Sequence, residues 1–86
     1  EAYLELAKTY QERRENGKAI QIYQQAIRVA PNDYRPYFSA GLILRESKDY
    51  VEAETMLRKA AELSPDNVNI RRQLGAIVAL NLVHNS

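Results

Sequence analysis

Five of the six tyrosines recur along the chain and could act as stacking platforms for nucleic-acid bases. They are Tyr3, Tyr10, Tyr23, Tyr37 and Tyr50. A site of that kind also needs a basic surface to hold the phosphate backbone. The chain instead has 12 Lys and Arg against 11 Asp and Glu, with the two signs interleaved and a net charge of +1. We therefore expect the tyrosines to pack between structural elements, and we expect no nucleic-acid partner.

Carboxylates and hydroxyls are the other groups that could react. The candidates are Glu1, Glu5 and Glu12 for acid–base chemistry and Thr9, Ser39 and Thr55 as nucleophiles. Acid–base carboxyl groups need shifted pKa values in a site that excludes water, and a hydroxyl needs an activating base. The chain has no Cys and one His, His84, near its end, so neither a triad nor a metal site can be assembled. The sequence predicts a non-catalytic protein with no metal and no cofactor.

Apolar residues recur with the period of an α-helix, as in the stripe formed by Tyr3, Leu6, Ala7 and Tyr10. Turn residues separate the stripes: Asn16 and Gly17 could adopt left-handed or cap conformations, and Pro31 and Pro65 stop the helices before them. The pattern predicts five helices, over residues 2–14, 18–30, 34–47, 50–63 and 67–83.

Polar residues mark the starts of three of these helices. Asp33 and Asn67 are expected to cap the third and fifth, and Pro36 is tolerated in the first turn of the third. Asp49 with Glu52 resembles a capping box for the fourth. The longest apolar stretch, residues 76–80, is far shorter than the roughly 20 residues that span a bilayer. We expect a soluble intracellular protein without membrane insertion, for which cytoplasm and plastid are not distinguished.

A shift of thirty-four residues superposes the chain on itself, which is the signature of a repeat array. Ala7 aligns with Gly41 and Gly75, and Pro31 aligns with Pro65. The first unit reads Y-x2-L-A-x2-Y, A-x3-Y, A, P, and the second reads Y-x2-A-G-x2-L, A-x3-L, A, P. This ordered set resembles the tetratricopeptide repeat, whose pattern is W-x2-L-G-x2-Y, A-x3-F, A, P.

The resemblance implies an all-α fold, a right-handed α-solenoid of antiparallel helix pairs. It divides the chain into repeat one (residues 1–33), repeat two (34–67) and a first helix of a third repeat or a capping helix (68–86), a single domain of about two and a half repeats. Arg14 and Lys48 depart from the family pattern because they stand where a turn glycine is usual. We expect the chain to be a fragment of a longer array.

In this family the first helices of successive repeats line a concave groove that holds peptides. The resemblance places six candidate binding residues there: Lys8, Arg35, Phe38, Leu42, Arg45 and Arg72. Phe38 and Leu42 are apolar where a solvated face would be polar, through either ligand binding or packing on neighbouring helices. The arginines would suit an acidic partner or a C-terminal carboxylate.

A chaperone-tail clamp, built in part of the family from two Lys, two Asn and one Arg, is not reproduced. The corresponding residues here are Leu4, Lys8, Ser39, Asn69 and Gln73. Docking of acidic chaperone tails is therefore not the expected function.

The last predicted helix is apolar on more than one face over residues 74–83. Either a further helix of a longer chain covers it, which we favour, or the chain forms a homodimer through Ile77, Leu80 and Val83. The resulting hypothesis is a non-catalytic protein–protein interaction module, part of a scaffold or assembly factor, that binds a protein or peptide in its groove. The alternative is a structural segment that self-associates through this helix.

Overall fold

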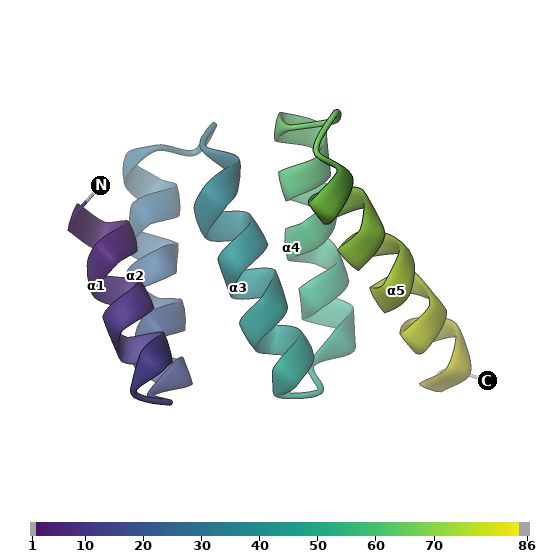
Figure 1. Cartoon of the computed structure of the whole chain (residues 1–86), viewed down its shortest axis with the longest axis horizontal. Helices are drawn as coiled ribbons and strands as arrows, with labels where there is room; N and C mark the ends of the chain where they lie inside the picture. Colours follow the sequence, from purple (N-terminus) through teal and green to yellow (C-terminus); the bar gives the residue numbers. More distant parts are fainter. Residues whose placement is uncertain (1, 85–86) are drawn as a thin grey trace.

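The structure is a computed structural model that describes residues 2–84, and its five α-helices stand side by side in chain order (Figure 1). They are α1 (Ala2–Glu12), α2 (Asn16–Val29), α3 (Tyr34–Glu46), α4 (Tyr50–Leu63) and α5 (Val68–His84). No strand occurs among these residues. All five predicted helices are present, with ends that move by one or two residues. The all-α solenoid expected from the sequence is confirmed.

The helices form two layers. α1, α3 and α5 make the front layer in Figure 1, and α2 and α4 lie behind them. α1 packs against α2 and α3 against α4 as antiparallel pairs, while α2 contacts α3 and α4 contacts α5 across successive repeats. The molecule measures 39 × 27 × 19 Å, so no part of its core is thick.

Small residues occupy the contacts between paired helices. Ala7, Ala19, Ala53 and Ala60 have no exposed surface. A Cβ added to Gly41 would lie 2.9 Å from Leu57 Cγ and 3.0 Å from Leu57 Cδ2, inside the distance that carbon atoms keep. Gly41 and these buried alanines are therefore places where α-helices touch.

The tyrosines behave as packing residues in most positions. Tyr23 and Tyr37 are buried, and the Tyr37 hydroxyl donates to the Pro31 carbonyl at 3.1 Å. Tyr10 and Tyr50 are partly buried against the core. Tyr3 is 39% exposed, so the expectation of packing does not hold for that residue.

The turns inside both repeats share one hydrogen-bond pattern. Arg14 N–H donates to the Gln11 carbonyl (3.0 Å) and the next N–H to the Tyr10 carbonyl (2.8 Å). Lys48 N–H donates to the Arg45 carbonyl (3.0 Å) and the next N–H to the Leu44 carbonyl (2.9 Å). This is a Schellman motif, in which the residue after the helix takes a left-handed conformation.

Arg14 and Lys48 are the residues that take the left-handed conformation, with φ of 62° and 66°. The turn therefore keeps its left-handed conformation although Arg or Lys replaces the glycine that is usual in the family. The expectation that Asn16 and Gly17 supply this conformation is wrong, because both already belong to α2. An L residue with a side chain pays a steric cost there that Gly avoids.

The residues predicted to cap α3 and α5, which begin after the two inter-repeat turns, do so in the structure. The Asp33 carboxylate accepts a hydrogen bond from Arg35 N–H (3.0 Å), and Asn67 Oδ1 accepts one from Ile70 N–H (3.2 Å). Both predicted caps are confirmed. Asp49 stands at the start of α4, but its side chain makes no capping hydrogen bond, so the predicted capping box does not form.

α5 packs on α4 through both apolar side chains and hydrogen bonds. Ile77 is completely buried with Leu44, Ala53 and Leu57, and Leu80 is partly buried against the same cluster. Asn81 Nδ2 donates to the Tyr50 carbonyl (3.0 Å) and to Glu54 Oε1 (2.7 Å). Ile77 is therefore not exposed for the homodimer contact that the sequence suggested, whereas Val83 is 72% exposed. No helix within residues 2–84 is long and apolar enough to cross a membrane.

Gly41 and Gly75 occupy equivalent repeat positions in different surroundings, since a Cβ on Gly75 would meet nothing within 4 Å. We expect Gly75→Ala to stabilise the protein by about 1 kcal/mol through helix propensity alone. Gly41→Ala should be less stable than Gly75→Ala by about 1–3 kcal/mol because Leu57 must move. Thermal unfolding followed by circular dichroism tests both, and equal melting temperatures would show that α3 and α4 do not meet at Gly41.

Replacing the left-handed residues with glycine should relieve strain. We expect Arg14→Gly and Lys48→Gly each to raise the free energy of unfolding by about 0.5–1 kcal/mol, the left-handed penalty less the added chain entropy. Lys18→Gly, at an exposed position inside α2, is the control and should destabilise by up to about 1 kcal/mol. Destabilisation by both turn variants would contradict the assigned conformation.

Candidate partner-binding groove

A groove with a volume of about 450 Å³ lies across the front layer, between α1, α3 and α5. Each of the three front helices contributes side chains, and one comes from α2 in the back layer. The lining consists of Leu4, Glu5, Lys8, Tyr23, Tyr34, Arg35, Phe38, Ser39, Asn67 and Asn69.

α3 is the central wall because only one of its faces is covered. Pro36, Tyr37, Ala40, Gly41 and Leu44 are among its buried residues. Residues 34, 35, 38 and 39 fall on the other face, at spacings of three and four, and these line the groove. One face of α3 therefore packs on the neighbouring helices, and the other presents two aromatic residues, Tyr34 and Phe38, and two polar residues, Arg35 and Ser39, to the groove.

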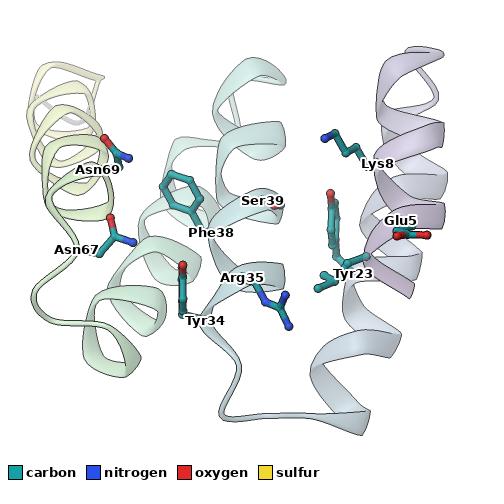
Figure 2. A pocket seen from close by; sticks show the side chains of 10 residues that line it. Glu5, Lys8, Tyr23, Tyr34, Arg35, Phe38, Ser39, Asn67 and Asn69 are labelled. Atoms are coloured by element: carbon teal, nitrogen blue, oxygen red, sulfur yellow. The ribbon is translucent and has the colours of Figure 1, made fainter. Parts of the chain in front are cut away.

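Figure 2 shows the two sides of this opening. The Phe38 ring and Tyr34 lie on the side of α3 that faces Asn67 and Asn69 at the start of α5. Lys8 extends from α1 toward α3 on the other side, above Tyr23. A ligand in the groove would meet aromatic and amide groups on one side of α3.

A second hollow of about 870 Å³ continues the groove toward the C-terminal ends of α1 and α3. It shares Lys8, Tyr23 and Ser39 with the first, and its further lining is Gln11, Glu12, Arg14, Asn16 and Glu46. The Tyr23 hydroxyl donates to Gln11 Oε1 at 3.1 Å, which fixes the tyrosine between α1 and α3. The two hollows form one continuous surface whose second part is more polar.

The structure brings together three of the six predicted binding residues, Lys8, Arg35 and Phe38. Leu42 is partly buried and lines neither hollow. Arg45 donates to Gln73 Oε1 and so joins α3 to α5, and Arg72 is exposed on α5 outside both hollows. Binding through these six residues stays a prediction.

The resemblance also places Leu4, Glu5, Ser39 and Asn69 in the groove, and all four line it. Three lining residues lie outside the positions that the resemblance assigns to the groove: Tyr23, Tyr34 and Asn67. Tyr23 belongs to the second helix of its repeat and is 3% exposed, so its spacing marks it as core. Tyr34 precedes Phe38 by four residues, which is the signal that could have placed it on the same face. Asn67 was assigned to capping, which it also performs.

The Arg35 guanidinium is engaged by Asp33 at the rim of the groove. Arg35 Nη2 lies 2.7 Å from Asp33 Oδ2, and Arg35 Nε lies 3.0 Å from Asp33 Oδ1. The hydrogen bond from this guanidinium lowers the pKa of Asp33 below its usual value, and its capping bond to the Arg35 backbone acts in the same direction. The carboxylate is therefore ionised at neutral pH and offsets the charge of Arg35.

No group of three His, Asp or Glu side chains within residues 2–84 is placed to hold a metal ion. Glu5 and Glu12 lie exposed on α1, and Glu1 lies outside the described residues. The groove lining offers aromatic surface, amides, hydroxyls and single charges.

Comparison with known proteins supports the repeat assignment. The tetratricopeptide repeat model matches residues 1–33 and 34–67, most of the chain. The chain is also similar to protein SLOW GREEN 1, chloroplastic, of Arabidopsis thaliana, with 35% identity over 57 residues. That match covers 66% of this chain and 18% of the relative, so the chain spans less than a fifth of the length of the curated protein it matches.

Protonation of Asp33 at acidic pH should weaken its ion pair with Arg35 and lower the stability of the fold. The pKa of Asp33 is lower in the folded state, so its contribution to stability is present above the unfolded value near 4 and lost as pH falls through the folded value. We expect the wild type to lose more free energy of unfolding than Asp33→Asn as pH falls below about 4. Asn retains the capping oxygen, whereas Asp33→Ala should cost about 0.5–2 kcal/mol at pH 7.

Urea unfolding at a series of pH values measures this difference. Parallel loss of stability in wild type and Asp33→Asn would show that the ion pair contributes nothing to the fold.

Proposed function

Because the chain belongs to the tetratricopeptide repeat family, whose repeats generally mediate protein–protein interactions, we propose that it holds an extended segment of a partner protein in the groove between α1, α3 and α5. The segment would lie across the three front helices and contact residues from both repeats and from α5. Such a role requires binding and no bond-making step, in keeping with a family that is typically non-catalytic. The wider role in a scaffold or assembly belongs to this proposal.

Phe38 is the observation that carries the proposal. Its ring lines the groove while its other contacts reach two buried clusters, one around Leu57 and one around Tyr37. Phe38 therefore packs on neighbouring helices and still presents surface to the groove, which supports the proposal that a ligand contacts it. An aromatic ring held rigidly at the centre of a concave surface is the kind of residue that dominates binding energy in protein interfaces.

The proposal is tested by selecting random 12-residue peptides displayed on phage against the immobilised chain and measuring the affinity of selected peptides by fluorescence anisotropy. We expect Phe38→Ala to weaken binding about five- to thirtyfold, and Phe38→Leu, which retains apolar volume, to weaken it less. Val51→Ala is the matched control, because Val51 is 65% exposed on α4 and lines neither hollow.

Thermal unfolding of each variant separates loss of binding from loss of fold. Peptides that bind Phe38→Ala and wild type equally, with both proteins folded, would exclude the groove as the binding surface.

A further inference from the structure

One of the two cations in the groove lining is offset by a carboxylate of the chain. Arg35 is paired with Asp33, whereas the Lys8 side chain extends toward α3 and the Glu5 carboxylate points away from the opening (Figure 2). Arg45, which the sequence offered as another anionic anchor, is engaged with Gln73. An acidic ligand at Arg35 would therefore meet a guanidinium whose charge is already offset by a carboxylate of the same chain.

Uncharged groups make up the remainder of the lining near Phe38. Tyr34 and Phe38 present aromatic surface, and Ser39, Asn67 and Asn69 present a hydroxyl and two amides. Asn67 uses its Oδ1 to cap α5, which leaves its Nδ2 as a donor for a ligand carbonyl. Amides and hydroxyls can pair with the backbone of an extended peptide without requiring a charge on it.

We propose that the groove is selective for an uncharged peptide segment that inserts a bulky apolar side chain beside Phe38, and that Asp33 determines this selectivity by neutralising Arg35. The inference rests on the proposed function and adds the chemistry of the partner. It differs from the acidic partner that Arg35, Arg45 and Arg72 suggest when the sequence is considered alone.

Asp33 is suited to this role because its two oxygens accept hydrogen bonds from Nε and Nη2 of the guanidinium. Arg35 contacts both carboxylate oxygens, so a ligand carboxylate would have to displace Asp33 or share the guanidinium with it. Displacement would also disturb the cap of α3, because the same carboxylate accepts from Arg35 N–H. Recognition of an anion by displacement of Asp33 would therefore act against the cap of α3.

The test compares the peptides that phage display of random 12-residue sequences selects on wild type, on Phe38→Ala and on Asp33→Asn. We expect the Phe38-dependent peptides from wild type to share a Leu, Ile, Met or aromatic residue and to have a net charge near zero. Asp33→Asn keeps the capping oxygen and removes one negative charge. Its affinity for analogues of these peptides with Asp or Glu added should rise about two- to fivefold at low salt and return toward wild type at high salt.

Glu62→Gln is the charge-matched control, since Glu62 pairs with Lys59 on α4 and lines neither hollow. It should leave the preference unchanged. Phe38-dependent peptides rich in Asp or Glu on wild type would overturn the inference and leave the groove function intact, and an unchanged preference in Asp33→Asn would overturn the role of Asp33. Absence of any Phe38-dependent peptide would overturn the proposed function itself.

Discussion

The approach of α3 to α4 at Gly41 is the constraint on which the rest of the structure depends. A thin two-layer molecule has no deep interior, so its helices are stabilised where their backbones come close enough for side chains on each to fill the gaps on the other. Gly41 lies against Leu57, and fully buried alanines serve the same purpose in the first pair. Once that face of α3 is buried, Tyr34, Phe38 and Ser39 lie toward the other side, and the groove exists because no helix within residues 2–84 covers them completely.

The turns at Arg14 and Lys48 illustrate how packing overrides a local preference. Both residues adopt the left-handed conformation that glycine tolerates best, and both complete the same pair of hydrogen bonds to the preceding helix. The antiparallel helices on either side determine where the chain must reverse, so the turn geometry is the same whether or not a glycine is present. Local strain of this size is tolerable because each pair buries fully enclosed residues such as Ala19 and Leu57.

Much of the fold could be predicted from the sequence because several independent signals in the repeat mark the same helix boundaries. The period of thirty-four, Pro31 with Pro65, and the caps Asp33 and Asn67 all indicated the same boundaries. α5 was harder, since apolar residues on several faces do not indicate which side is buried, and Ile77, suggested as a homodimer residue, is fully buried within the chain. In the groove, Tyr23 could not be told from a core residue by spacing. The Asp33–Arg35 pair was missed because each residue had already been given another role.

The two roles of Asp33 connect the fold to the character of the groove. One carboxylate caps α3 and holds the Arg35 guanidinium, so the residue that starts the central wall also sets the charge at its rim. The hydrogen bonds that lower the pKa of Asp33 keep it ionised throughout the neutral range, so this balance does not change with physiological pH. A surface arginine is usually a ready anchor for an anion. Here an anion for it is supplied by the chain itself, two residues earlier, and we therefore look to Phe38 and its neighbouring amides as the features by which a partner would be recognised.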